Sequence, residues 1–387
     1  MKRVYLDNAS TTPIKDEVIK SMVNVLRYSF GNPSSIQHHY GRKSRSIIEE
    51  SRICIANIIH ADPSEIIFTS GGTEGNNLAI QVAISDLKVE HIITSKLEHF
   101  SVLKTILDLY HKDKISVSFI SFDKKGIHDL NHMENILNKF SSKKVLVSLM
   151  YVNNEIGNIL EIKKVIEICK KYNAYFHSDA IQAIGNIPIN VKSLLFDFAT
   201  VSAHKIYGPK GIGFIFIRKN LLKNIKSFII GGSQEHGIRS GTENIYGIVG
   251  MAKAIELSID HYLNYKKKMQ KLKLYCISKL KEHIPNILFN GLSFDTKKSV
   301  FSIINLLFPV MDHLLYFRLD IMGISISKGS TCIQGTKSSH VIQSITNHEL
   351  LKKMMPIRIS LGFFNEKKDI DLLIHSLKKI IKQKNVL

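Results

Sequence analysis

A lysine stands at the end of an apolar run, directly before a turn of glycine and proline. The segment reads Ser202-Ala203-His204-Lys205-Ile206-Tyr207-Gly208-Pro209. A lysine held in an interior cleft can lose its proton through desolvation, and the neutral amine can form a Schiff base with an aldehyde cofactor. The alternative is a surface lysine before a turn, which is the usual place of this residue. Lys205 therefore becomes a candidate only if suitable partners accompany it.

An aspartate at the end of the preceding apolar run is such a partner. Asp179 lies in the segment His177-Ser178-Asp179-Ala180-Ile181-Gln182. An aspartate that faces a pyridine nitrogen keeps it protonated and makes the ring an electron sink. Gln182, one helical turn further on, could reach the phenolic oxygen of the same ring. The alternative for Asp179 is a helix N-cap.

Two further segments place polar groups after apolar runs. The turn at 69–77 contains Gly72 and Thr73 and precedes a predicted helix, so its backbone N–H groups and the helix dipole suit a phosphate. His99 follows the run 91–94, and an imidazole over a planar ring can stack on it and move protons near neutral pH. Each signal is weak alone, because glycine-rich turns are common and a single histidine is more often structural.

One of the four cysteines differs from the others. Cys332 lies in a polar, glycine-containing stretch at 328–341, which is typical of a loop nucleophile. Cys54, Cys169 and Cys276 lie in helix-like apolar patterns and are predicted to be small buried hydrophobic residues. No C-x-x-C pair is present, so neither a metal knuckle nor a disulfide framework is expected.

The elements that must position these residues form two groups. Short apolar runs at 65–69, 91–94, 115–120, 145–152, 174–178, 198–202 and 211–218 alternate with helical patterns such as 17–28, 44–59, 102–110 and 162–172. This alternation predicts a largely parallel sheet covered on both faces. In such sheets, ligands bind beyond the carboxyl ends of the strands, which is where Lys205, Asp179 and His99 stand.

After a long helical stretch at 242–284 the pattern changes to a smaller α+β arrangement. Strands are predicted at 299–307, 323–327 and 357–361, and helices at 312–322, 348–354 and 368–381. We therefore predict a large domain at 16–257 and a small domain made of 1–15 and 258–387, which carries the Cys332 loop.

The composition excludes several classes of protein. Hydrophobic residues make up 44% and charged residues 22% of the chain, as in ordinary globular proteins. No apolar run reaches the roughly 20 residues that span a bilayer, and the N-terminus does not resemble a signal peptide, so we expect a cytoplasmic protein without a membrane anchor. The net charge of +20 comes from scattered lysines without a recognisable binding motif, so no specific nucleic-acid binding is expected.

Several motifs together resemble the NifS/IscS-type cysteine desulfurases of the class V aminotransferase family. They are Phe30-Gly31-Asn32-Pro33-Ser34-Ser35, the turn at 69–74, Val152-Asn153-Asn154-Glu155-Ile156-Gly157, the run at 202–211 and Arg239-Ser240-Gly241-Thr242. They follow the family's order along nearly the whole chain. The resemblance implies an α/β protein of fold type I, with a mainly parallel seven-stranded sheet in the large domain and a smaller α+β domain, and pyridoxal phosphate as the cofactor.

The resemblance also implies a role for each candidate residue. Lys205 corresponds to the Schiff-base lysine, Asp179 to the partner of the pyridinium nitrogen, and His99 to the stacking acid/base residue. Gln182 and Asn154 correspond to groups around the ring oxygen and the substrate, and Gly72, Thr73, Ser202 and His204 to the phosphate site. Thr242 resembles the threonine that reaches the phosphate of the neighbouring subunit, which implies a homodimer. Arg358 resembles the arginine that binds the substrate carboxylate, and a guanidinium suits a carboxylate because its fork can bind both oxygens.

The implied reaction converts L-cysteine to L-alanine and leaves a persulfide on Cys332. The sulfur acceptor would be an iron-sulfur scaffold protein or a tRNA-thiolation enzyme. Selenocysteine lyase and another class V aminotransferase-type activity are the alternatives, and an aminotransferase has no need of the Cys332 loop. The loop reads Gly-Ser-Thr-Cys where the family has Gly-Ser-Ala-Cys and is about one residue shorter, and His236 stands where an arginine is usual.

Overall fold

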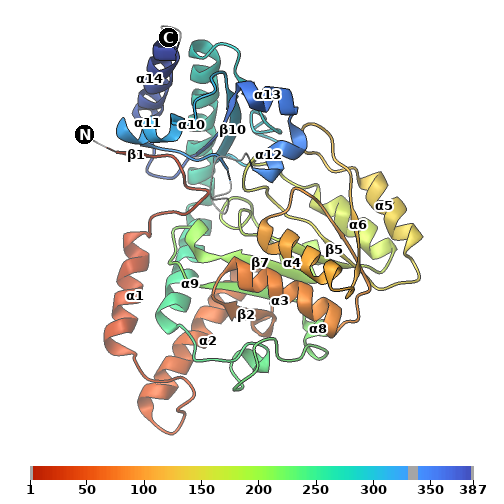
Figure 1. Ribbon diagram of the computed structural model, residues 1–387. Helices are drawn as coiled ribbons and strands as arrows, with labels where there is room; N and C mark the ends of the chain where they lie inside the picture. The colour runs from red at the N-terminus through yellow and green to blue at the C-terminus, as the bar shows by residue number, and fades with distance from the viewer. Residues whose placement is uncertain (1–2, 330–338, 385–387) are drawn as a thin grey trace.

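A seven-stranded sheet forms the centre of the computed structural model, which describes residues 3–329 and 339–384. The strand order is β2-β8-β7-β6-β5-β3-β4, and Figure 1 labels β2, β5 and β7 of this sheet. The strands are β2 (Ile66–Thr69), β3 (His91–Thr94), β4 (Ser116–Phe119), β5 (Val145–Ser148), β6 (Tyr175–Asp179), β7 (Phe198–Ser202) and β8 (Gly213–Ile217). β8 runs antiparallel to both of its neighbours, β2 and β7, and the other pairs of this sheet are parallel. The prediction of a mainly parallel sheet is confirmed.

The reversal of β8 follows from the length of its connection to β7. The segment between Ser202 and Gly213 contains one short 3-10 turn, Ala203–Lys205, and no crossover helix. Parallel neighbours need a crossover of a dozen or more residues, whereas antiparallel strands can be joined by a short turn. The turn that carries Lys205 therefore lies at the carboxyl edge of the parallel strands.

Both faces of this sheet are buried under helices. In β8, Phe214 and Phe216 pack into one hydrophobic cluster and Ile215 and Ile217 into the other, because successive side chains of a strand point to opposite faces. One cluster includes α3 (Gly72–Ser85) and α4 (Phe100–His111). The other includes α1 (Asp16–Tyr28), α2 (His39–Ile59), α5 (Leu130–Lys139), α6 (Ile162–Lys171), α7 (Val191–Leu194) and α9 (Ile245–Asp260). The short helix α8 (Lys219–Leu222) follows β8.

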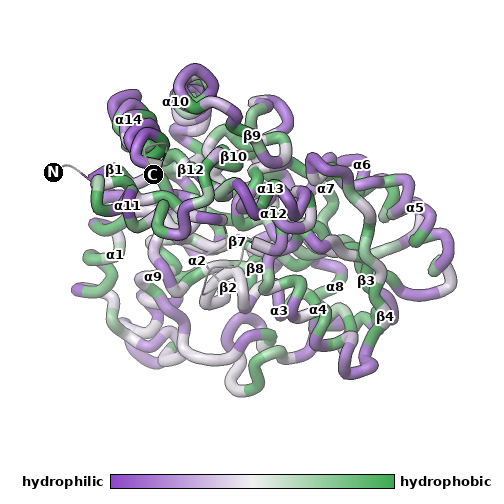
Figure 2. The backbone as a smooth tube through the Cα atoms, turned by 45° about the horizontal axis from the view of Figure 1, so that its top comes forward, coloured by the Kyte–Doolittle hydropathy of each residue, from purple (hydrophilic) through white to green (hydrophobic). Residues whose placement is uncertain are grey.

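A separate hydrophobic cluster surrounds a small antiparallel sheet of order β12-β10-β9. Its strands are β9 (Leu288–Phe289), β10 (Ile303–Phe308) and β12 (Met355–Ser360), and a parallel pair joins β1 (Val4–Tyr5) to β11 (Ile324–Ser325). Side chains of α10 (Tyr262–His283), α11 (Leu315–Ile321) and α14 (Lys367–Lys384) join this cluster, whereas α12 (His340–Ile345) and α13 (His348–Lys353) contribute to a further small cluster. Figure 2 shows purple and green alternating along α14, as expected for a helix with one buried face.

The predicted helical stretch 242–284 is wrong as a single element. It consists of α9 and α10, which are interrupted at His261 with φ −103° and ψ 5°. Side chains of α9 join the cluster of the large sheet, and those of α10 join the smaller cluster, so a change of packing partner accompanies the break. The domain boundaries at 15/16 and 257/258 stay a prediction.

Two of the three described cysteines are buried. Cys169 and Cys276 are buried as predicted, whereas Cys54 is only half-buried, because it lies at the border of the buried face of α2.

Within residues 3–329 and 339–384, no helix combines the length and apolar character needed to cross a bilayer.

Candidate active site

A cavity of about 240 Å³ lies at the carboxyl edge of the large sheet. Its lining includes most of the residues predicted from the sequence: Gly72, Thr73, His99, Asn154, Asp179, Gln182, Ser202, His204, Lys205 and Arg358. Thr242 is exposed and does not line this cavity. Cys332 lies outside the residues that the structure describes.

Neighbouring strands deliver these side chains to one place. Gly72 follows β2, His99 follows β3, Asn154 follows β5, Asp179 ends β6 and Ser202 ends β7. Because β3, β5, β6 and β7 are parallel, their carboxyl ends meet at one edge of the sheet. Arg358 reaches the cavity from β12 of the small sheet.

Lys205 is held by an N-terminal segment that the sequence did not single out. Its Nζ donates hydrogen bonds to the carbonyl oxygens of Ala9 and Ser10, at 2.7 Å each. Nε2 of Gln182 donates to the same oxygen of Ala9, at 2.9 Å. The chain at 9–10 therefore fixes both the amine and the amide at the cavity wall.

Asp179 is a buried carboxylate with two hydrogen-bond donors. Oδ2 accepts a hydrogen bond from Nδ2 of Asn76 at 2.8 Å, and Oδ1 accepts one from the backbone N–H of Ile181 at 3.1 Å. Burial raises the pKa of Asp179, while His99, the two hydrogen bonds and Lys205 act in the opposite direction and favour the ionised form. A cation beside this carboxylate would favour ionisation further.

His99 caps the helix α4 with its ring. Its Nδ1 accepts a hydrogen bond from the backbone N–H of Ser101 at 3.1 Å, and Oγ of Ser101 lies 2.8 Å from the same nitrogen. Burial lowers the pKa of His99, with Asp179 opposing and Lys205 and His340 assisting this shift. The ring therefore favours its neutral form beside Asp179.

The glycine turn before α3 brings the N-terminus of this helix to the wall of the cavity. Gly71 has φ +153°, a conformation that L side chains rarely adopt, and a Cβ on Gly72 would overlap Cδ1 of Ile181. A Cβ on Gly71 would lie 3.7 Å from Oγ of Ser202, so the N-terminus of α3 lies next to this hydroxyl. Burial, assisted by Lys205 and Lys210, lowers the pKa of His204 to about 4, so this ring is neutral at pH 7.

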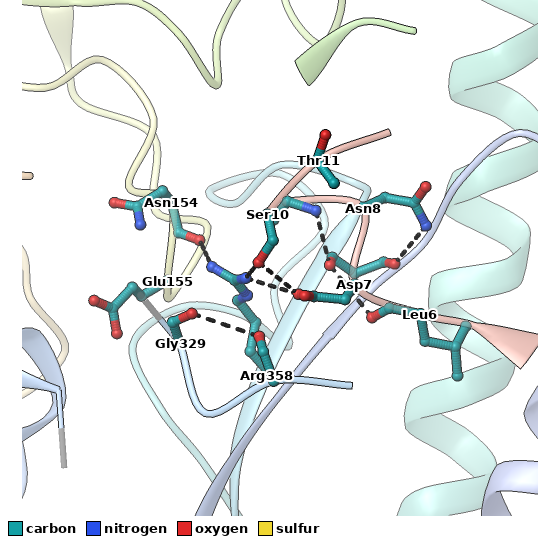
Figure 3. A network of polar contacts seen from close by, with 12 residues as sticks. Leu6, Asp7, Asn8, Ser10, Thr11, Asn154, Glu155, Gly329 and Arg358 are labelled. Carbon is teal, nitrogen blue, oxygen red and sulfur yellow. Dashed lines mark hydrogen bonds and ion pairs between the residues drawn. The ribbon is translucent and has the colours of Figure 1, made fainter. Parts of the chain in front are cut away.

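Arg358 is buried in a network with the N-terminal segment (Figure 3). One guanidinium nitrogen, Nη2, donates to Oδ1 of Asp7 at 2.8 Å and to Oγ of Ser10 at 2.5 Å, and Nη1 donates to the carbonyl oxygen of Asn154 at 2.9 Å. The Arg358 side chain is 1% exposed and that of Asp7 is 16% exposed. Asp7 therefore compensates a buried cation, and residues 7–10 connect Arg358 to Lys205.

The described residues on either side of 330–338 lie next to this site. Gly329 has φ +143°, and a Cβ there would overlap Oε2 of Glu155, the neighbour of Asn154. On the other side, Nε2 of His340 donates to the carbonyl oxygen of Glu98 at 2.9 Å, and its ring stacks on Phe100 with centroids 4.3 Å apart. Both flanks of the segment that contains Cys332 therefore contact chain neighbours of cavity residues.

Sequence reasoning missed several residues of the cavity and its support. Ala9, Ser10, Ser101, Met150 and Ile181 also line the cavity, and Asp7 and Asn76 hold its charged groups. The polar run Asp7-Asn8-Ala9-Ser10-Thr11-Thr12 is a visible signal in the sequence. Its contacts are with residues about 200 and 350 positions away, and no local pattern indicates them.

Comparison with known proteins gives a consistent result. The family model described as Aminotransferase class-V matches residues 4–373. A cysteine desulfurase IscS of Dictyoglomus turgidum is 41% identical over 99% of this chain and 96% of that protein. A solved structure described as a NifS-like protein has a TM-score of 0.89 at 33% identity and covers 98% of this chain and 99% of that one.

A second solved structure, the apo form of a cysteine desulfurase from Thermococcus onnurineus, has a TM-score of 0.85 at 25% identity and covers 98% of this chain and 95% of that one. These likenesses span essentially the whole chain and agree with the fold type I architecture described above. The chain belongs to the class V aminotransferase family, among its NifS/IscS-type cysteine desulfurases.

Proposed function

We propose that this chain is a pyridoxal-phosphate-dependent cysteine desulfurase, which converts L-cysteine to L-alanine and an enzyme-bound persulfide. The observation that carries the proposal is the single cavity that gathers Lys205, Asp179, His99 and Arg358. An amine, a buried carboxylate, a neutral imidazole and a guanidinium in one cavity match the needs of amino-acid chemistry on an aldehyde cofactor.

The donor set of the cavity fits pyridoxal phosphate. Lys205 would attach the cofactor covalently, Asp179 would hold the ring nitrogen, and Gln182 and Asn154 would lie near the ring oxygen. The N-terminus of α3 at Gly72, with Thr73, Ser202 and His204, would hold the phosphate. The buried carboxylate of Asp179, with two donors that favour its ionised form, is the structural feature that supports this fit. The cofactor, when bound, supplies a sink for the electron pair left at the substrate Cα.

Arg358 and Lys205 would act on the amino acid itself. Arg358 would bind the substrate carboxylate, because its guanidinium is buried and lines the cavity. Lys205 would take the proton from Cα at Nζ, and the carbonyl oxygens of Ala9 and Ser10, 2.7 Å away, would stabilise the resulting ammonium group.

Cys332 would accept the sulfur. Its thiolate would form a bond to the substrate sulfur while the Cβ–S bond of the substrate breaks, and the bonding pair of that bond would stay on carbon and take a proton. The products are alanine and a persulfide on Cys332. The assignment rests on the sequence of the 328–341 segment and on the described flanks, which lie beside the cavity.

The proposal extends to partners and location. Thr242 is exposed and away from the lining of its own cavity, which suits a threonine that serves the phosphate site of a second copy in a homodimer. The persulfide would pass to an iron-sulfur scaffold protein or a tRNA-thiolation enzyme in the cytoplasm.

The test is an assay of the purified protein with pyridoxal phosphate and L-cysteine. We expect equal amounts of alanine and transferred sulfur, and mass spectrometry after one turnover should find the extra sulfur on the peptide that contains Cys332. The variant Cys332→Ser should release no alanine above background, whereas the matched control Cys54→Ser should keep its activity, because Cys54 lies on α2 and does not line the cavity. Alanine release at the normal rate by Cys332→Ser would refute the role of Cys332.

A further inference from the structure

A buried asparagine joins the two titratable groups on one side of the cavity. Nδ2 of Asn76 donates one hydrogen bond to Oδ2 of Asp179 and a second to Oγ of Ser101, both at 2.8 Å. Asn76 is 0% exposed, Asp179 is 3% exposed and Ser101 is 7% exposed. The two hydrogens of this amide are therefore committed to partners inside the protein.

The orientation of the Asn76 amide follows from its partners. A carboxylate only accepts hydrogen bonds, so the amide nitrogen must face Asp179. Oδ1 of Asn76 is then buried without a hydrogen-bond partner in the described part of the chain. A buried acceptor without a partner destabilises the fold, so the two hydrogen bonds that the amide donates hold it in this orientation.

Ser101 extends the hydrogen-bond network from Asn76 to His99. Its Oγ accepts from Asn76, which leaves its own hydrogen for Nδ1 of His99 at 2.8 Å. The backbone N–H of Ser101 donates to the same Nδ1 at 3.1 Å. A nitrogen that accepts two hydrogen bonds cannot carry a hydrogen, so the neutral ring must carry it on Nε2.

We propose that Asn76 and Ser101 are positioning residues that hold His99 as the neutral tautomer with its hydrogen on Nε2. The proposal deepens the proposed function, because it defines what His99 can do in that cavity. Nδ1, the only nitrogen able to take a proton, is occupied by the Ser101 network. In this tautomer His99 contributes a fixed N–H donor at Nε2 and a neutral stacking ring.

The charged surroundings agree with a neutral ring. Asp179 on β6 favours the imidazolium form, whereas burial, Lys205 after β7 and His340 on α12 oppose it and lower the pKa of His99. Protonation at Nδ1 would also require both hydrogen bonds from Ser101 to break.

The test is NMR spectroscopy of the full chain labelled with [13C,15N]-histidine, with His99→Gln used to identify the signals of His99. In the wild-type protein at pH 8, we expect an unprotonated Nδ1 and a protonated Nε2. Ser101→Ala should raise the titration midpoint of His99 by about half to one pH unit and should mix the two tautomers, because one donor to Nδ1 is lost. Asn76→Ala should shift both readouts in the same direction.

Two controls separate this role from a general effect on folding. Ser101→Thr keeps the hydroxyl and should restore the wild-type tautomer and midpoint. Thr105→Val removes a hydroxyl from the same helix, one that bonds to Ser101 O and to Asn77, and should change neither readout. A wild-type ring with its hydrogen on Nδ1, or an unchanged tautomer and midpoint in Ser101→Ala, would overturn the proposal. Neither readout depends on alanine release, so a failure of the desulfurase assignment is seen separately.

Discussion

Lys205 and Arg358, two of the side chains that would act directly on the substrate, are both held by the N-terminal segment. Ala9 and Ser10 accept hydrogen bonds from Lys205, and Asp7 and Ser10 bind Arg358. Main-chain carbonyls and a short serine leave little rotational freedom, so both groups are placed before a ligand arrives. Such preorganisation lowers the cost of binding and reaction.

Lys205 should be the covalent attachment point of the cofactor. The protein with bound cofactor should be yellow, and reduction with borohydride followed by peptide mapping should find the cofactor on the peptide that contains Lys205. Lys205→Ala should lose this attachment and the activity. Lys210, five residues further on and exposed, is the matched control, and Lys210→Ala should keep the attachment. Cofactor on a different lysine would contradict the assignment.

Loss of Arg358 should weaken binding of cysteine more than binding of the cofactor. A buried carboxylate–guanidinium pair is worth about 2 kcal/mol or more, which corresponds to a roughly thirtyfold increase in KM for Arg358→Ala. Because Arg358 also pairs with Asp7, circular dichroism must show that the variant is folded. Arg358→Lys keeps the charge without the fork and should give an intermediate KM. An unchanged KM in both variants would remove Arg358 from the substrate site.

At the scale of elements, the direction of each strand decides which residues meet. The parallel strands bring residues that follow β3, β5, β6 and β7 to one edge, and the short turn after β7 keeps Lys205 at that edge.

The helix α10 buries a lysine side chain by its packing. Its Lys273 is 0% exposed, and Nζ donates to Oγ of Ser299 and to the carbonyl oxygen of Val300, at 2.7 Å each.

Lys273 should make the stability of the fold depend on pH in the alkaline range. Burial lowers the pKa of Lys273 to about 7, below the value of about 10.4 in an unfolded chain. Between these values the unfolded chain binds more protons than the folded protein, so the free energy of unfolding rises with pH. Below pH 7 the folded protein bears the full cost of burying the charged ammonium group.

The expected slope is about 1.4 kcal/mol per pH unit for this one group. Urea unfolding at pH 7.5, 8.5 and 9.5 should show that the wild-type free energy of unfolding rises relative to that of Lys273→Met by roughly this slope. Lys271→Met, at an exposed position of the same helix, is the control, and its free energy of unfolding should run parallel to that of the wild type. A difference between wild type and Lys273→Met that does not change with pH would show that Lys273 is charged in the folded protein.

At the scale of the whole molecule, two large apolar side chains are exposed where a second copy of the chain could bind. Ile230 is 90% exposed and Phe30 is 71% exposed, and Phe30 begins one of the family motifs. Contiguous exposed apolar patches often mark protein interfaces, and we propose that these two side chains lie in such an interface. Thr242 is exposed and away from its own cavity, and the proposed homodimer with shared sites would account for both observations.

The chain should therefore form a dimer of twice its mass of 43.9 kDa in light scattering of the active enzyme, and a purely monomeric active species would refute the proposal. A complementation experiment tests the shared site. Lys205→Ala and Thr242→Ala should each be impaired alone, but a mixed dimer should regain activity, because one of its two sites then has an intact Lys205 and an intact Thr242 from the partner. No recovery in the mixed dimer would place Thr242 in the site of its own chain.

The sequence alone determined the mainly parallel sheet and most of the cavity lining. Period-2 and period-3.6 patterns are local, and the carboxyl ends of parallel strands must meet, so the sequence by itself places residues such as Asp179, Ser202 and His99 at one edge. The family motifs added Asn154 and Arg358 in the same way, because their signals are short runs of neighbouring residues.

Only the tertiary structure decided how those residues are held. Asp7 and Arg358 are separated by 351 positions, and Asn76 and Asp179 by 103, so no local pattern links them. The same applies to the break between α9 and α10, where one continuous helical pattern changes its packing partner at His261. The tautomer of His99 depends on two hydrogen bonds from Ser101 and on an amide 25 positions before that serine. Long-range hydrogen bonds and packing are set by the three-dimensional arrangement of the elements, and for that reason the sequence predicted the members of the site but not the network that orients them.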